Sequence, residues 1–153
     1  MKSTQDWLDA YGESHQNLIN KKIHWICVPL IMFSLIGLLW CIPMPGFLSF
    51  GGHFNWAWVL AIIAFTFYGF LNLKMFAGMF LIIGLMMFGN FHMANLENHL
   101  WVSICIFVFS WVMQFVGHKI EGKKPSFFKD LQFLLIGPLW VFYPLYKKLG
   151  IQV

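Results

Sequence analysis

The sequence has few charged residues and no arginine. Only 10% of its 153 residues are charged, and all ten basic residues are lysines. A soluble domain carries about 25% charged residues, whereas 59% of this chain is hydrophobic and 20% is aromatic, with a mean hydropathy of +0.70. The shortage of charge excludes an ordinary soluble domain. It predicts an all-α, polytopic membrane protein with a single integral membrane domain over residues 1–153.

Patterned cysteines and basic clusters are missing as well. Cys27, Cys41 and Cys105 show neither CxxC spacing nor a disulfide framework, so we interpret them as small packing residues. The net charge of +4 comes from lysines that flank apolar runs. This pattern disfavours nucleic acid as a partner and is typical of contact with membrane lipids. The polar residues before Ile23 contain no short apolar core, so we expect no cleavable signal peptide.

Long apolar runs divide the chain into expected membrane segments. A single helix over Trp56–Met93 would be about 57 Å long, well beyond a hydrocarbon core of about 30 Å, so this run must turn back. The polar residues Asn72 and Lys74 place that turn. The expected elements are an amphipathic interfacial helix at 4–20, spans at 23–42, 56–72, 75–92 and 100–117, and a short apolar segment at 131–146. The last segment is short for a full span, which leaves re-entrant, steeply inserted and interfacial arrangements open.

The lysines predict which side of the membrane each loop occupies. In a four-span arrangement, eight lysines up to Lys129 fall on one side, whereas the two opposite loops, 43–55 and 93–99, contain none. The positive-inside rule assigns the lysine-rich side to the cytoplasm. The six histidines then divide into a cytoplasmic set, His15, His24 and His118, and an opposite set, His53, His92 and His99.

The cytoplasmic histidines are the candidate metal ligands. His24 begins the first expected span and His118 ends the fourth, so both would lie at the same depth. His15 joins them only if the chain bends near Asn20, where the interfacial helix would turn into the membrane. Nitrogen ligands of this kind, with or without a carboxylate, suit Fe(II) or Zn(II).

Two further polar residues accompany His118. Gln114, His118 and Glu121 recur at i, i+4 and i+7, so they share one face of a helix. Glu121 is a candidate ligand or catalytic carboxylate, and Gln114 is placed to orient a ligand.

Several other interpretations stay open at this point. The cytoplasmic histidines would equally serve as hydrogen-bond donors to lipid headgroups. On the opposite side, His92, Asn95 and His99 share a helical face if the third span extends that far, with His53 as their one partner. A diiron lipid hydroxylase needs more histidines, in HxxH-like clusters. A non-catalytic metal-, haem- or lipid-binding membrane protein is the main alternative to an enzyme, and a small structural protein is another.

Two stretches of the sequence resemble a known family. They are Tyr11-x3-His15-x4-Asn20-x3-His24-x4-Pro29 and Gln114-x2-Gly117-His118, followed by Glu121 and Pro125. The order of these motifs, at opposite ends of a four-span core, resembles the fungal 2-hydroxy fatty acid dioxygenases. The resemblance covers nearly the whole chain, including Gly137-Pro138 in the short apolar tail.

The resemblance implies an Fe(II)-dependent dioxygenase that removes one carbon from a 2-hydroxy fatty acid by α-oxidation. It makes His15, His24 and His118 the expected iron ligands and Glu121 a fourth candidate. A 2-hydroxy acid chelates iron through its hydroxyl and carboxylate groups and leaves a position for dioxygen.

Expectations about the substrate and the membrane come from several sources. Lys21, Lys22 and Lys119 are expected to attract the substrate carboxylate, with Tyr11 and Asn20 as further substrate-binding residues. The resemblance implies the endoplasmic reticulum if the protein is eukaryotic, the compact chain without a retention tail favours the inner membrane of a bacterium, and the lysines place the active site toward the cytoplasm. Dioxygen and membrane lipids are the other expected partners.

Overall fold

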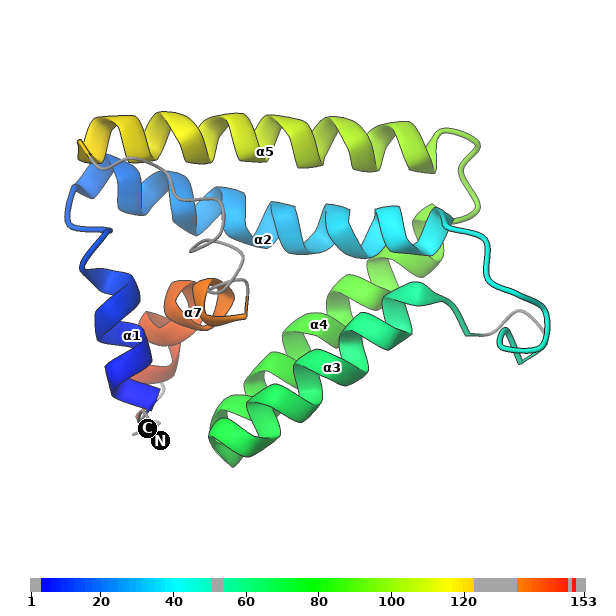
Figure 1. Ribbon diagram of the computed structural model, residues 1–153, viewed down its shortest axis with the longest axis horizontal. Coiled ribbons are helices and arrows are strands. Elements are labelled where there is room, and N and C mark those ends of the chain that lie inside the picture. Colours follow the sequence, from blue (N-terminus) through cyan, green and yellow to red (C-terminus); the bar gives the residue numbers. More distant parts are fainter. Residues whose placement is uncertain (1–3, 51–53, 123–134, 149, 151–153) are drawn as a thin grey trace.

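The computed structural model describes residues 4–50, 54–122, 135–148 and 150 of the chain. These residues form helices and no strands, as expected (Figure 1). The helices are α1 (Thr4–Gly12), α2 (Leu18–Cys41), α3 (Trp56–Leu71), α4 (Leu73–Met93), α5 (His99–Glu121) and α7 (Ile136–Lys148). The predicted all-α class is therefore confirmed for the described part of the chain.

The N-terminal segment is two elements joined by a short connection. The sequence predicts one helix over 4–20 and a span from 23, but α1 ends at Gly12 and α2 already begins at Leu18. Asn17 causes the new start, because its side chain accepts hydrogen bonds from the backbone N–H groups of Ile19 and Asn20. An Asn side chain in this position satisfies donors that a helix N-terminus leaves unpaired. The predicted bend exists, a few residues earlier than expected.

Asn72 forms the turn between α3 and α4, as the sequence predicts. Its extended backbone ends α3, and its side chain accepts a hydrogen bond of 2.8 Å from the backbone N–H of Lys74 at the start of α4. One residue therefore ends one helix and caps the next, and the two helices run antiparallel as a hairpin (Figure 1).

The prediction of four spans and a fifth segment is wrong in its count. Three described helices, α2, α4 and α5, are long and apolar enough to cross a membrane. The 16 residues of α3 correspond to about 24 Å of helix, which is less than a hydrocarbon core of about 30 Å. The 13 residues of α7 make it shorter still. Residues 131–134 of the predicted segment 131–146 lie outside the described residues.

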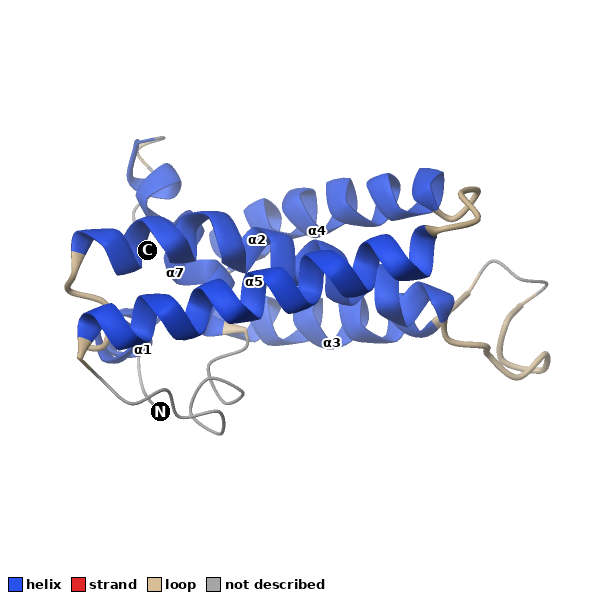
Figure 2. Ribbon diagram, turned by 90° about the horizontal axis from the view of Figure 1, so that it is seen from above, coloured by secondary structure: helices blue, strands red, loops and turns tan. Residues whose placement is uncertain are grey.

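The α3–α4 hairpin diverges from the α2–α5 pair toward the end that holds α1 and α7 (Figure 1). α5 runs antiparallel to α2 along its length, and the α3–α4 hairpin packs against the other side of α2 (Figures 1 and 2). α1 and α7 contact each other at the end where α2 begins and α5 finishes. The core between α3 and α4 includes the fully buried Ala57, Met75 and Met79.

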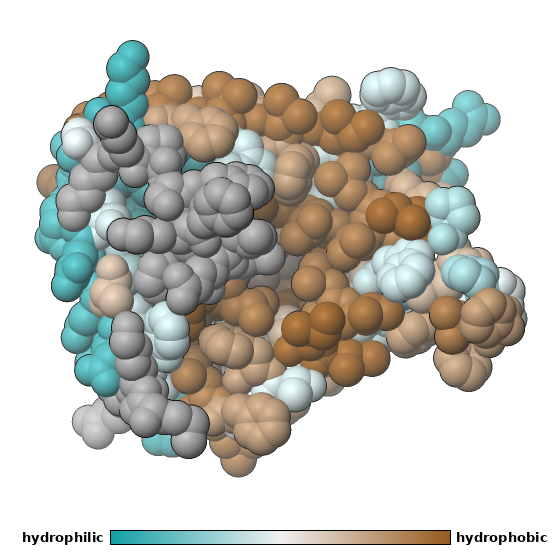
Figure 3. All heavy atoms as spheres, viewed as in Figure 1, coloured by the Kyte–Doolittle hydropathy of each residue, from teal (hydrophilic) through white to brown (hydrophobic). Residues whose placement is uncertain are grey.

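Many large hydrophobic side chains are also exposed on the outside. Figure 3 shows a wide hydrophobic face, with hydrophilic residues gathered at the end that holds α1 and a smaller group at the opposite end. Large apolar residues such as Phe70, Phe80 and Trp101 are exposed on α3, α4 and α5. A surface of this kind suits contact with lipid acyl chains and is rare on soluble monomers.

Candidate metal centre

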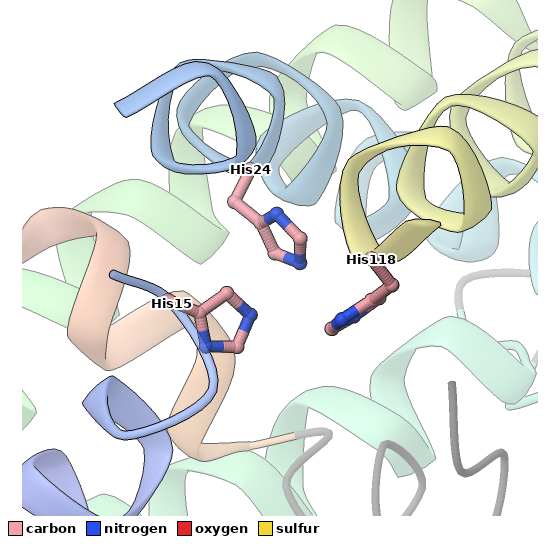
Figure 4. Close-up of side chains that lie close together, drawn as sticks. All are labelled: His15, His24 and His118. Atoms are coloured by element: carbon pink, nitrogen blue, oxygen red, sulfur yellow. The ribbon is translucent and has the colours of Figure 1, made fainter. Parts of the chain in front are cut away.

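Three histidines from three separate elements meet at the end where α1 and α7 lie. His24 belongs to the second turn of α2, His118 to the last turn of α5 and His15 to the connection between α1 and α2. Their side chains point toward one another (Figure 4), and their ring centroids are 4.3 Å (His15–His24), 5.3 Å (His15–His118) and 5.0 Å (His24–His118) apart. All three are buried, with 1 to 6% of their surface exposed.

Backbone carbonyl groups fix the tautomer of two of these rings. The Nδ1 atom of His15 lies 2.7 Å from the carbonyl oxygen of Tyr11, and that of His24 lies 3.0 Å from the carbonyl oxygen of Asn20. A carbonyl oxygen only accepts, so Nδ1 carries the proton and donates in both rings. The Nε2 atom of each neutral ring then keeps its lone pair for a metal, an arrangement that is usual for ligating histidines.

The residues present fit a metal ion. One potential ligand atom from each histidine lies within 4.8 Å of the other two, and among the described residues this is the one such group. Nitrogen atoms bound about 2.1 Å from one ion are roughly 3 to 3.5 Å apart, so binding would draw the rings slightly closer. Imidazole nitrogen suits Zn, Cu, Fe and Ni, and the donor set by itself does not choose among them.

Glu121, at the end of α5, binds the connection that contains His15. Its Oε1 atom accepts a hydrogen bond of 2.7 Å from the backbone N–H of Gln16. Its Oε2 atom accepts from the backbone N–H of Asn17 at 2.9 Å and from the side-chain amide of Asn20 at 3.0 Å. Both carboxylate oxygens are therefore engaged by protein donors, and Glu121 is not part of the group of converging ligand atoms.

Gly117 allows α2 and α5 to approach closely beside the histidines. A Cβ atom at this position would collide with the side-chain oxygen of Asn20, which is completely buried. Asn20 also donates to the backbone carbonyl of Ser14 at 3.4 Å, so it links the connection, α2 and Glu121. The Gly117-His118 pair thus combines a close helix contact with a ligand on the next residue.

A pocket of about 530 Å³, part of it open to the surroundings, adjoins the cluster. We call it the histidine pocket; its lining residues are Tyr11, His24, Val28, Ile31, Met32, Trp111, Gln114, Phe115, His118, Gly137 and Pro138. The side-chain oxygen of Gln114 is buried in the structure without a hydrogen-bond partner. Buried polar groups normally have one, so this oxygen is suited to accept a hydrogen bond from a ligand.

The remaining predicted site residues divide into two groups. Tyr11 lines the pocket, and its ring stacks on His15 with centroids 4.2 Å apart. Lys21 is partly exposed, Lys22 and Lys119 are exposed, and none of the three lines the pocket. The lysines lie at the same end of the molecule as the histidines, but away from their pocket.

The opposite histidines do not form a second cluster within the described residues. His99 is buried and contacts Asn90, whereas His92 is exposed and lies beside Phe88 with ring centroids 4.5 Å apart. Asn95 is exposed. His53 lies outside the described residues.

The contribution of α7 to the site is absent from the predictions. Trp140 packs its ring near those of Tyr11 and His15, with centroids 5.4 and 5.1 Å away. Gly137 and Pro138 line the histidine pocket. In the sequence, only the Gly137-Pro138 pair indicates that α7 forms part of the pocket wall. The rest of this short apolar helix has no charged or histidine side chain facing inward.

Comparison with known protein families identifies the family of this chain. A family described as 2-hydroxy-palmitic acid dioxygenase Mpo1-like matches residues 1–149. The chain belongs to the Mpo1-like family. It is also similar to a protein of Saccharomyces cerevisiae named 2-hydroxy-palmitic acid dioxygenase MPO1, with 27% identity over 151 residues, 94% of this chain and 79% of the yeast protein. No solved structure matches the chain.

Membership of the Mpo1-like family confirms the resemblance seen in the two motifs. The match extends over all six described helices, so it includes the three histidines and the residues of α7 that line the histidine pocket.

Proposed function

We propose that this protein is an Fe(II)-dependent 2-hydroxy fatty acid dioxygenase that carries out α-oxidation. The observation that carries the proposal is the buried group of three imidazoles, whose ligand atoms lie within 4.8 Å of one another beside a pocket. The description of the Mpo1-like family and the name of the yeast relative supply the substrate class and the reaction type.

The proposed reaction balances with dioxygen as the only oxidant. The bond between C1 and C2 of the 2-hydroxy acid breaks, and the products are the fatty acid one carbon shorter, carbon dioxide and water. Four electrons pass from these two carbons to dioxygen. Iron, when bound, supplies the one-electron chemistry that dioxygen requires.

The residues around the pocket have separate roles in this proposal. His15, His24 and His118 hold the ion as neutral ligands, so its full positive charge is left to attract the substrate carboxylate and hydroxyl. The buried oxygen of Gln114, a residue that lines the same pocket, accepts a hydrogen bond from the 2-hydroxyl group. Tyr11 forms part of the pocket wall and keeps the ring of His15 in place by stacking.

Glu121 and Asn20 act as positioning residues in this proposal. Their mutual hydrogen bond, and those of Glu121 to the backbone of Gln16 and Asn17, hold the connection that carries His15. Groups that orient a metal ligand commonly change metal affinity by about 10- to 100-fold when they are removed. A carboxylate with three such contacts therefore matters for the site without touching the metal.

The site faces the cytoplasm in the proposed membrane arrangement. Lys21, Lys22 and Lys119 lie near the histidines in the chain and stay at least partly exposed, a pattern that the positive-inside rule assigns to the cytoplasmic side. The protein would be a multi-pass protein of a bacterial inner membrane, or of the endoplasmic reticulum in a eukaryote. Exposed lysines on this side attract an acidic substrate from the membrane surface without contacting it in the pocket.

A metal-binding protein without turnover is the alternative, and one form of it fits poorly. Haem held by two of these histidines needs space for the macrocycle between them, but the three rings have centroids only 4.3 to 5.3 Å apart. The cluster therefore favours a single metal ion.

The test uses detergent-purified protein that is stripped with a chelator and reloaded with Fe(II) or Zn(II). With 2-hydroxypalmitate and dioxygen, only the iron-loaded protein is expected to release pentadecanoate and carbon dioxide in equal amounts. His118→Ala should abolish this activity, and His92→Ala, at an exposed histidine, should not. Full activity in His118→Ala would contradict the proposal, and metal binding without any turnover would favour the alternative.

A further inference from the structure

The histidine pocket adjoins a second pocket that is apolar. This apolar pocket measures about 520 Å³, part of it open to the surroundings, and shares three lining residues, Ile31, Met32 and Pro138, with the histidine pocket. The two pockets are therefore neighbours at the place where α2 passes the beginning of α7. Met32 is partly buried there, and a flexible methionine is well suited to a passage that must adapt to its occupant.

The lining of the apolar pocket comes from three helices and the start of α7. Leu35 and Ile36 lie one turn further along α2 than the shared residues, away from His24. Ala61 and Ala64 contribute from α3, where their small side chains leave space open, and both are buried. Ile83 closes the pocket from α4.

The polar side chain in this lining already has a hydrogen-bond partner. Tyr68 is the one lining residue with a polar side chain, and its hydroxyl donates a hydrogen bond of 2.7 Å to the backbone carbonyl of Leu135. An apolar cavity of this kind does not hold ordered water well, because water needs two to four polar partners.

We propose that the apolar pocket is the binding site for the acyl chain of the substrate and that its alanines set the preferred chain length. Together the two pockets match a fatty acid in polarity, because the histidines and Gln114 lie at one end and the other end is lined by apolar residues and the already hydrogen-bonded Tyr68. The carboxylate end stays at the histidines, and the chain passes between Met32 and Pro138 toward Ala64 and Ala61. This inference rests on the proposed function for the identity of the acid, but chain binding is measurable without any reaction.

Two opposite substitutions test the proposal. Ala64→Leu fills part of the pocket and should move the preference toward shorter acids, whereas Leu35→Ala enlarges it and should move the preference toward longer ones. Each methylene group that loses its place should weaken binding about fourfold, the equivalent of about 0.8 kcal/mol. We expect the ratio of kcat/KM for 2-hydroxypalmitate over 2-hydroxylaurate to fall at least about tenfold in Ala64→Leu. Ala77→Leu, on the exposed face of α4, is the matched control and should leave the ratio unchanged.

A second measurement makes the test independent of turnover. Palmitate and laurate, which lack the 2-hydroxyl group, compete with a photoreactive fatty acid for crosslinking to each variant, and the ratio of their inhibition constants is compared. Ratios are unaffected by the fraction of folded protein, so a poorly folding variant still gives an answer.

The outcomes separate this inference from the proposed function. Opposite shifts in Ala64→Leu and Leu35→Ala, by turnover or by crosslinking, support the acyl site. If crosslinking shifts while no protein consumes a 2-hydroxy acid, the acyl site stands and the proposed reaction fails. Unchanged ratios in both variants overturn the acyl site even where wild-type turnover is intact, and so does a wild-type protein that binds no fatty acid.

Discussion

The two ends of the α2–α5 pair both bury a histidine, yet the two environments differ. At the far end, Nε2 of His99 lies 3.1 Å from the side-chain oxygen of Asn90, and Nδ1 lies 3.6 Å from the sulfur of Cys41. Asn90 in turn donates to the backbone carbonyls of Phe33 and Met86. Both ring nitrogens of His99 therefore face groups of the protein itself.

At the near end, the contacts of the rings differ. His15 and His24 donate from Nδ1 to a carbonyl one turn earlier in the chain, and their rings face each other and His118. Burial of a histidine is thus common to a structural network and to a candidate metal site. The direction of its second nitrogen distinguishes them.

The largest expected effect is a difference in bound metal between a variant at the near end and a variant at the far end. Removal of an orienting group costs about 10- to 100-fold in metal affinity, so removal of a ligand in His24→Ala should cost more than about 100-fold and eliminate activity. His99→Ala should keep the full amount of iron. Metal analysis of the purified proteins after dialysis measures this difference, and equal iron loss in both variants would remove the distinction between the ends.

The next effect concerns Glu121. Glu121→Ala releases the connection that holds His15, so we expect metal affinity to fall about 10- to 100-fold while the helices stay folded. Glu121→Gln keeps one acceptor oxygen, so its metal affinity should lie between that of Glu121→Ala and that of the wild type. Glu97→Ala, at an exposed glutamate near the far end, is the control. Metal titration with a competing chelator measures the affinities. A loss in Glu121→Ala that Glu121→Gln does not partly restore would indicate a ligand and not a positioning residue.

Two glycines give a matched comparison of intermediate size. A Cβ atom at Gly117 would collide with the side-chain oxygen of Asn20, and one at Gly37 would collide with side-chain oxygens of Ser103 and Asn90. Overpacking of this kind costs about 1 to 3 kcal/mol. Gly117→Ala should lower metal affinity, whereas Gly37→Ala should lower thermal stability and leave the metal affinity of the folded protein unchanged. Thermal unfolding with and without metal tests both, and weaker metal binding in Gly37→Ala would show that the two ends are coupled.

The smallest expected effect belongs to Gln114. Gln114→Leu removes the buried oxygen that lacks a partner in the structure, so iron should stay bound while kcat/KM falls about fivefold, the equivalent of a typical hydrogen bond of about 1 kcal/mol. Steady-state kinetics on an iron-loaded sample measures this change. 2-Methoxypalmitate, which cannot donate from its oxygen, should be handled equally by both proteins, and an unchanged kcat/KM for 2-hydroxypalmitate would exclude the proposed contact.

Local signals in the sequence predict much of the fold and the core of the site. The length of the apolar run and the position of Asn72 give the α3–α4 turn, because an Asn between two apolar segments both ends and caps a helix. The three histidines come together in the structure as the lysine distribution suggested. Composition and spacing are sufficient for the turn, since it depends on residues close in the chain, whereas the histidines could be matched only because the distribution of lysines assigns the ends of distant helices to one side.

The features that the sequence does not reveal depend on contacts between distant residues. The spacing of Glu121 to His118 suggests a metal ligand, whereas the donors that occupy its carboxylate belong to Gln16, Asn17 and Asn20. α7 is short and apolar, so its packing of Trp140 beside Tyr11 has no periodic signal. The predicted span at 56–72 is not among the helices long enough to cross a membrane, because α3 ends at Leu71 and has only 16 residues, whereas α4 has 21.

The order of the ligands along the chain constrains how the protein is made. Gln16 and Glu121, which join the two sides of the site, are 105 residues apart. During synthesis, His15 and His24 leave the ribosome long before α5 exists, and a two-histidine site binds metal weakly. If the protein binds iron as proposed, loading therefore waits until α5 is in place, after which the bound ion closes a long loop and opposes its reopening. Under that proposal a ribosome-stalled chain that ends before α5 would remain without metal, so iron uptake would report that the last of the three long apolar helices described is in place.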